Sequence, residues 1–355
     1  MGECPRRAQR GGRMSPSTIH RDAPLITAWS AVSPFGLGRE AFAAGVGRGE
    51  PAHEVPDFDT RKVLGKAGTR TFDRATGLAV TAVRELLDEA EAAQSPIATG
   101  GGTALVLGTT LGSAHSSAGF SRASFEGDKP YDVPAQLMPN VLMNGPAAAT
   151  AIRFDLKGPN TTLAGGAAGG LLALGYARRL LAADRAERAV VGAVEEQSTT
   201  REWLAGLAEQ PLGEGSVVLL METARTLPPG RRVLAELLAL DVRLDIDDDP
   251  ARALADVVRE ALDQAGATPD EVWAAAVTGQ PARDQLAALV GAEAVDRVPA
   301  LFGDTGSAGT VFSLTTVLSL AEHDPTATGR VAVIASLDHQ GLAACAVLRL
   351  TGGDR

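Results

Sequence analysis

The chain has 355 residues, enough for one large domain or two medium domains with a substantial buried core. Its formal net charge of -10 argues against a nucleic-acid-binding surface, which needs clustered basic residues. Two cysteines, Cys4 and Cys345, are too few for a disulfide framework and indicate a cytoplasmic location. The sequence has no apolar run of about 18 residues, so no membrane-spanning helix and no membrane partner are expected.

The first 22 residues contain five arginines among Gly, Pro and Ser, without apolar periodicity. This composition predicts a disordered basic tail over 1–22. The tail lacks the apolar core of a secretory signal. Met14 is an alternative start of translation.

Residues 23–225 and 232–350 show a similar order of predicted elements, and we interpret them as two related halves. The first half has apolar runs typical of buried strands at 104–107, 161–164, 188–194 and 216–221. The second half has corresponding runs at 272–277, 297–302, 330–335 and 342–348. Helical periodicity occurs at 72–93, 171–183, 250–265 and 307–322. Continuous apolar strands that alternate with helices predict an α/β protein whose sheet is covered on both faces.

A Gly/Ala-rich turn stands between the predicted strand at 161–164 and the helix at 171–183. Six consecutive residues, 165–170, are Gly or Ala. A strand, a tight turn and a helix N-terminus form the arrangement that presents a catalytic Ser or Cys above a sheet. Every side chain at this apex is a hydrogen or a methyl, so none can attack a thioester. The simpler interpretation is a close contact between a helix and a strand. The turn at 303–309 holds the equivalent place in the second half.

The segment from Gly158 to Leu171 resembles the nucleophile motif of β-ketoacyl synthases, in which Gly-Pro is followed by seven residues and a Cys. Ala167 falls at the Cys position. The following Ala-Gly-Gly-Leu, 168–171, is similar to the chain-length factors of bacterial type II polyketide systems, in which the Cys is replaced. The segments 24–38 and 212–222 also resemble parts of this family. The resemblance covers roughly residues 23–350 and implies a thiolase-like fold, with two duplicated βαβαβαββ halves forming a layered α/β/α/β/α core.

The resemblance also implies that the catalytic partners of the Cys are missing. In the synthases, two histidines and a lysine stabilise the developing charges. Ala276 falls at the first His position, and Gly303 or Asp304 at the second. The chain's four lysines, which all precede the second half, are Lys62, Lys66, Lys129 and Lys157. No catalytic residue is therefore expected at the family positions.

Two other polar segments are candidate sites. Asp338 and His339 lie in the segment 337–341, which resembles an altered gating loop and is the best remaining place for an unusual catalytic function. A solvated turn between strands is the simpler interpretation. The acidic segment 245–249 lacks the spacing of an EF-hand and is predicted to be a turn before the helix at Pro250. No dinucleotide or phosphate-binding fingerprint is present, so neither a cofactor nor a metal is expected.

The family resemblance implies a non-catalytic chain-length factor that pairs with an active ketosynthase. An acyl carrier protein would deliver the growing polyketide chain, which would run into a tunnel along the shared interface. The segment 133–140 resembles the loop that reaches toward the partner's pocket, so Gln136, Leu137 and Met138 are the predicted interface and tunnel residues. Leu111 matches a position that gates the acyl pocket in related synthases. Ordinary packing is the alternative for all four.

Two other functions remain open at this point. One is a stand-alone thiolase-fold acyltransferase with relocated chemistry on a Ser, on His339 or on Asp304. The other is a scaffold that binds acyl chains or a carrier protein without a ketosynthase partner. The sequence does not state the product or its length. The Ala at the apex slightly favours a pathway to highly reduced or polyene chains over an aromatic one.

Overall fold

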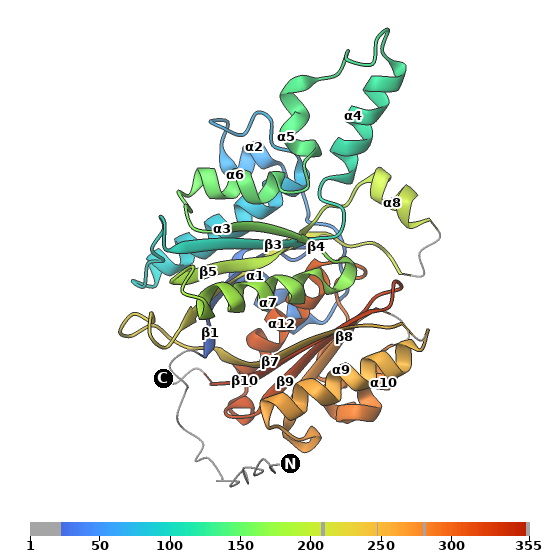
Figure 1. Cartoon of the computed structure of the whole chain (residues 1–355). Helices are drawn as coiled ribbons and strands as arrows, with labels where there is room; N and C mark the ends of the chain where they lie inside the picture. The colour runs from blue at the N-terminus through green and yellow to red at the C-terminus, as the bar shows by residue number, and fades with distance from the viewer. Residues whose placement is uncertain (1–22, 207–209, 247, 280–281, 353–355) are drawn as a thin grey trace, which may run out of the picture.

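The computed structural model describes residues 23–206, 210–246, 248–279 and 282–352 (Figure 1). The tail predicted for 1–22 lies outside these ranges. The strands are β1 Pro24–Ser33, β2 Gly36–Leu37, β3 Thr103–Thr109, β4 Asn160–Ala164, β5 Arg188–Glu195, β6 Gly215–Thr223, β7 Ala235–Leu244, β8 Val272–Thr278, β9 Val331–Leu337 and β10 Leu342–Leu350. The α-helices are α1 Gly38–Arg48, α2 Thr60–Leu64, α3 Arg74–Ala92, α4 Ala114–Glu126, α5 Met138–Val141, α6 Gly145–Arg153, α7 Gly169–Ala182, α8 Thr199–Ala205, α9 Pro250–Ala265, α10 Ala282–Val290, α11 Ala292–Asp296 and α12 Ala308–Ala321.

The strands are connected in the order β4-β3-β5-β6-β1-β7-β10-β9-β8. β1 and β7 join the two groups through the antiparallel pairs Leu25↔Glu236 and Ile26↔Ala235. From this joint outward, the order β1-β6-β5-β3 of the first group is repeated by β7-β10-β9-β8 in the second. This repetition is the duplication that the thiolase-like fold implies. The division into 23–225 and 232–350 stays a prediction.

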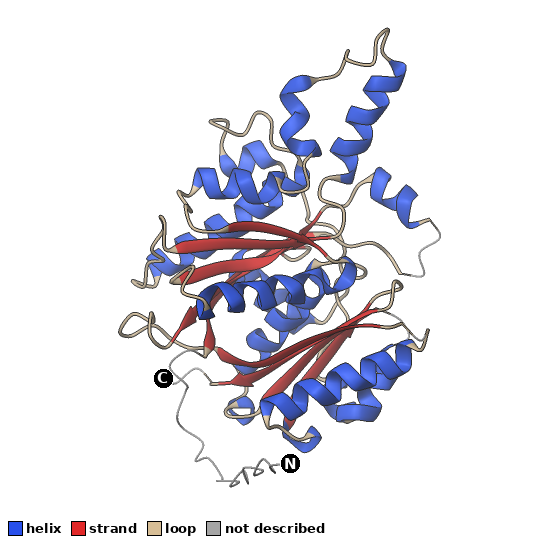
Figure 2. Cartoon of the chain, in the orientation of Figure 1, coloured by secondary structure: helices blue, strands red, loops and turns tan. Residues whose placement is uncertain are grey.

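The positions of the helices define the layers of the fold. Helices α7 and α12 run between the two groups of strands (Figures 1 and 2). Helices α3 and α6 cover the outer face of the first group, and α9 and α10 cover the outer face of the second. This α/β/α/β/α arrangement is the predicted fold.

The buried apolar residues in the described ranges form three cores. The middle core contains the stacked rings of Phe302 and Phe312, whose centroids are 4.5 Å apart, together with Phe42. The two outer cores lie beneath α9 and α3 and are built largely from Ala, Val and Leu. Several of the chain's few aromatic side chains therefore lie where the two halves meet.

The predicted strand at 297–302 is wrong. This segment follows α11 without strand structure, so in the described residues the second group has no counterpart of β4. Pro299 lacks the N–H that a ladder requires. The apolar side chains of Val298, Leu301 and Phe302 are nevertheless buried in the middle core. The run is therefore apolar because it packs against that core, and burial alone does not make a strand.

Candidate functional site

The predicted strand, turn and helix surround Ala167. β4 ends at Ala164, and a 3₁₀ turn over Gly166–Ala168 leads into α7. Gly166 has a φ of 52°, a conformation that glycine adopts without strain. Ala167 is half-buried. The apex therefore has the backbone of a nucleophile turn and carries only a methyl group.

Close packing explains why the turn is made of glycines. A Cβ atom on Gly169 would lie 2.2 Å from Ser307 Oγ, and one on Gly170 would lie 2.5 Å from Val311 Cγ2. On the other side, a Cβ on Gly108 of β3 would lie 2.7 Å from the carbonyl carbon of Gly169. The start of α7 is thus pressed between β3 and the second half, as the simpler interpretation of a close contact also requires.

The turn of the first half meets the turn of the second half through hydrogen bonds. Ser307 Oγ donates to the carbonyl of Gly166 at 2.7 Å. The Ser307 N–H lies 3.2 Å from both Glu195 Oε1 and Thr110 Oγ1. The N–H of Thr110 donates to the same Glu195 oxygen at 2.5 Å. One carboxylate at the end of β5 therefore joins the loop after β3 to the N-terminus of α12.

Glu195 is fully buried at this junction. Removal from water raises the pKa of its carboxyl group, and the charge of Arg201 together with the hydrogen bonds from Thr110 and Ser307 opposes that rise. The guanidinium of Arg201 donates to the carbonyls of Glu196, Gly213 and Asp304. This cluster stabilises the contact between the halves and has no exposed reactive group.

The positions matched to the catalytic histidines differ in the space around them. Ala276 is a buried residue of β8. Gly303 has a φ of 64°, and a Cβ there would lie 2.4 Å from the carbonyl oxygen of Pro211 and 2.9 Å from His53 Nδ1. Asp304 is exposed, and its Oδ1 accepts a hydrogen bond from the N–H of Gly306 at 2.8 Å. A histidine side chain at 303 would require the neighbouring backbone to move.

Asp338 and His339 lie in different environments. Asp338 is 8% exposed, and a Cβ on Gly166 would lie 2.6 Å from its Oδ2. Its Oδ1 accepts hydrogen bonds from the N–H groups of Gln340 and Leu342, each at 2.9 Å. His339 is exposed. The structure therefore brings Asp338 to the apex of the turn, while His339 lies at the surface of the β9–β10 hairpin.

The four predicted tunnel and interface residues are all exposed in this chain. Leu111 lies just after β3. Gln136 and Leu137 lie in a 3₁₀ turn that leads into α5, and Met138 is the first residue of α5. The segment that carries α4 and α5 projects from the body of the molecule (Figure 1). It exposes further large apolar side chains that the sequence interpretation missed: Phe125, Tyr131, Leu142 and Met143. Ile152 of α6 is exposed as well. Burial periodicity does not reveal them, because it assumes that apolar side chains face the chain's own core.

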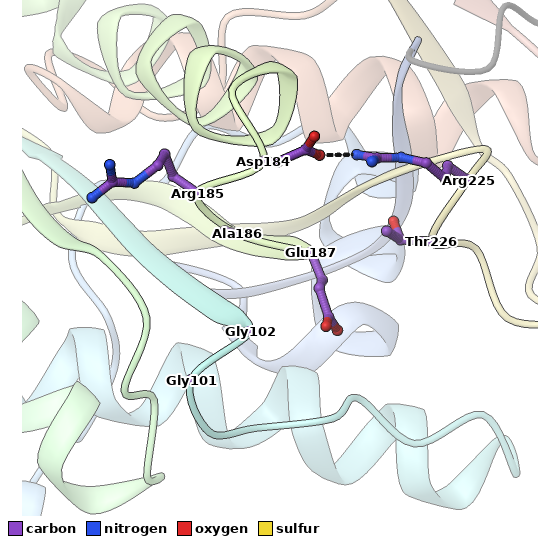
Figure 3. A pocket seen from close by; sticks show the side chains of 8 residues that line it. All are labelled: Gly101, Gly102, Asp184, Arg185, Ala186, Glu187, Arg225 and Thr226. Atoms are coloured by element: carbon purple, nitrogen blue, oxygen red, sulfur yellow. Dashed lines mark hydrogen bonds and ion pairs between the residues drawn. The ribbon is translucent and has the colours of Figure 1, made fainter.

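Two surface depressions lie at the other ends of the strands. Figure 3 shows one of about 580 Å³, lined by Gly101, Gly102, Asp184, Arg185, Ala186, Glu187, Arg225 and Thr226. It precedes β3 and β5, whereas the Gly/Ala-rich turn follows β4 in the same parallel group. Asp184 and Arg225 form an ion pair across it. This surface therefore lies away from the turn.

Two further classes of site are not found in the described part of the chain. No group of three or more His, Cys, Asp or Glu side chains could hold a metal ion there. None of the helices in the same ranges is both long and apolar enough to cross a membrane.

The layered fold and the turn at its centre identify a thiolase-like protein. Comparison with known proteins assigns the chain to one family with this fold. The beta-ketoacyl synthase N-terminal domain matches residues 27–214. The chain belongs to the beta-ketoacyl synthase family. A chain of the structure titled "The ishigamide ketosynthase/chain length factor" is 42% identical, with a TM-score of 0.88, over 93% of this chain and 100% of that one.

Matches at lower sequence identity support the same family assignment. The 3-oxoacyl-[acyl-carrier-protein] synthase 2 of Coxiella burnetii is 24% identical over 67% of this chain and 64% of that protein. The Vibrio harveyi protein of the same name is 26% identical over 54% and 51%. The matches thus span less than two thirds of these relatives. A β-ketoacyl synthase from Burkholderia phymatum, 18% identical over 93% of this chain and 99% of that one with a TM-score of 0.73, shares the fold.

Proposed function

We propose that this protein is the non-catalytic, chain-length-setting subunit of a ketosynthase heterodimer. The partner would carry the reactive Cys, and an acyl carrier protein would present the growing polyketide chain. The similar structure whose title names a ketosynthase and a chain length factor supports this assignment. A structure of the same fold, with a TM-score of 0.76 and 16% identity over 93% of this chain and 100% of that one, is titled as a type II PKS acyl-carrier protein in complex with its ketosynthase.

The main support for the proposal is that the turn has the backbone arrangement of the family's nucleophile turn but no reactive side chain. Ala167 carries no nucleophilic group, and Asp304, one of the two positions matched to the second histidine, carries a carboxylate in place of an imidazole. At the other position, Gly303, a side chain would meet the carbonyl of Pro211 and the ring of His53. Claisen condensation requires a thiolate and donors for the oxyanion. The backbone of the turn is preserved while each of these groups is missing. We infer that the turn is kept for its shape.

The distribution of exposed apolar side chains supports the binding of a protein partner. Of the twelve exposed large apolar side chains in the described ranges, eight lie between residues 111 and 152. β4 is the edge strand beside this segment, so its outer backbone groups are available for pairing. Exposed apolar side chains gathered beside a sheet edge are typical of an interface. We propose that the ketosynthase partner covers this surface and that Leu111, Gln136, Leu137 and Met138 line the acyl tunnel there.

The alternative acyltransferase has less support. Ser307, the serine nearest the apex, is completely buried, and its hydroxyl is engaged with Gly166. His339 and Asp304 are exposed, and no ion pair or hydrogen bond between their side chains occurs in the described residues. A nucleophile and a base within hydrogen-bond reach are the usual signature of such chemistry. Among the described residues around the turn, this signature is not found.

Reconstitution tests the proposal. The chain is expressed alone and together with a ketosynthase that has an intact Cys, and each sample is incubated with loaded acyl carrier protein. We expect a heterodimer, condensed products only when both subunits are present, and an acyl mass increase only on the partner. Acylation of this chain alone would indicate the acyltransferase, and tight acyl or carrier binding without a partner would indicate the scaffold. Either result would overturn the proposal.

A further inference from the structure

A carboxylate of the second half lies directly against the apex of the nucleophile-like turn. Asp338 immediately follows β9, and the 3₁₀ turn Gly166–Ala168 packs against β9 and β10. A Cβ at position 166 would lie 2.6 Å from Asp338 Oδ2. Gly166 is the residue before Ala167, the position at which the family carries its Cys. The negative charge is therefore next to the place where the reacting atoms would be.

The hairpin holds this carboxylate in a fixed orientation. Oδ1 accepts hydrogen bonds from the N–H groups of Gln340 and Leu342, and the backbone of Asp338 pairs with Leu342 and Gly341 at 3.1 Å. With Oδ1 bound to the hairpin, Oδ2 remains directed at Gly166. Asp338 is buried, with 8% of its surface exposed, so solvent screening of its charge is limited. No ion pair to Asp338 occurs within the described ranges, so we find no cation that neutralises it there.

Acyl transfer at such a turn develops negative charge twice. The nucleophile must first become a thiolate, and the attacked carbonyl then becomes an oxyanion. A fixed like charge disfavours both species and raises the pKa of a neighbouring acid. The N-terminus of α7 would by itself favour an anion. The two effects oppose each other, and the carboxylate carries a full charge whereas the helix terminus carries about half of one.

We propose that Asp338 is an anion-excluding residue that prevents the turn from holding a thiolate, an oxyanion or the carboxylate of an acyl substrate. The inference deepens the proposed function, because it adds a charge barrier to the missing nucleophile. Only neutral groups, such as the alkyl part of an acyl chain, would approach Gly166 and Ala167 without repulsion.

Thiol reactivity tests the proposal without any partner or condensation. In a Cys4→Ser background, we compare Ala167→Cys with Ala167→Cys/Asp338→Asn by their rates of iodoacetamide alkylation across pH, located by mass spectrometry. The native Cys345 is buried and its thiol pKa is raised, so it reacts slowly. Asn keeps an acceptor for Gln340 and Leu342. We expect the Asn change to lower the pKa of the new thiol by about one unit and to speed alkylation at neutral pH about tenfold.

Two controls make the result decisive. Asp270→Asn removes an exposed carboxylate at the opposite end of the second half and should leave the new thiol unchanged. If Asp338→Asn unfolds the chain, Ala167→Cys alone suffices, since its thiol pKa should lie above the ordinary value of about 8.5. A value below 8.5, or equal profiles with and without the Asp338 carboxylate, overturns the proposal. Both outcomes leave heterodimer formation, and so the proposed function, untouched.

Discussion

The hydroxyl of Ser307 donates a 2.7 Å hydrogen bond to the carbonyl of Gly166, 141 positions earlier in the chain. Ser307 is the N-cap residue of α12, and Gly166 begins the 3₁₀ turn that leads into α7. The Ser307 N–H is also bound by the buried carboxylate of Glu195. The turns are therefore held together by polar contacts that do not need a nucleophile, and the central geometry of the fold persists without one.

Adding a methyl group at this contact should destabilise the protein. A Cβ on Gly169 would lie 2.2 Å from Ser307 Oγ, so Gly169→Ala should cost about 1–3 kcal/mol through overpacking. Gly119→Ala is the matched control, because Gly119 lies in α4 and a Cβ added there would have no other atom within 4 Å. The control should be neutral or gain about 0.4–1 kcal/mol. Urea unfolding measures both, and equal stabilities would contradict the packing argument.

Glu195 should make stability depend on pH. Burial raises the pKa of its carboxyl group, so its contribution is present at low pH and is lost as pH rises through the folded-state pKa. Gln keeps an oxygen to accept from Thr110 and Ser307 but carries no charge. The stability of Glu195→Gln relative to wild type should therefore increase from about pH 5 to pH 8.

The surface variant Glu293→Gln is the control for this titration, because Glu293 is exposed on α11. Its stability relative to wild type should change little over the same pH range. A difference between wild type and Glu195→Gln that stays constant with pH would show that the buried carboxylate does not titrate in this range.

The tunnel residues should control product length when the partner synthase is present. Leu111→Ala and Met138→Ala would each open space that an acyl chain can fill, and each added CH₂ gains about 0.8 kcal/mol on burial. One extra two-carbon unit could shift the product distribution by about tenfold. Ile246→Ala is the control, because Ile246 is exposed before α9 and lies outside the surface assigned to the partner. Active variants with unchanged product lengths would place the tunnel elsewhere.

Ala167→Cys should not restore condensation. The new thiol would lack both histidines, and each oxyanion donor is worth about 10²–10³ in rate. The measurement is product formation by the variant alone with loaded carrier protein. Detectable condensed product would mean that Ala276 and Gly303 are not the correct histidine positions.

Some elements could be predicted because local signals agree with the tertiary structure. The helix Pro250–Ala265 was predicted with its observed bounds, since Asp249 caps it and its apolar residues keep helical spacing. Strand β7 was not predicted, because Asp241 and Arg243 interrupt its apolar run. The apolar run 297–302, in contrast, was predicted as a strand and has no strand structure. Burial and strand structure give the same apolar pattern, so periodicity cannot separate them.

The sequence by itself determined what this protein lacks and how its elements alternate. The residues at the apex, the places of all lysines and the apolar runs are visible without coordinates. Only the tertiary structure decided that Asp338 faces Gly166 and that His53 lies against Gly303. These contacts join segments far apart in the chain, and their distances depend on sheet register and helix packing. A sequence pattern states which groups are present, whereas their electrostatic effect depends on the few ångströms between them.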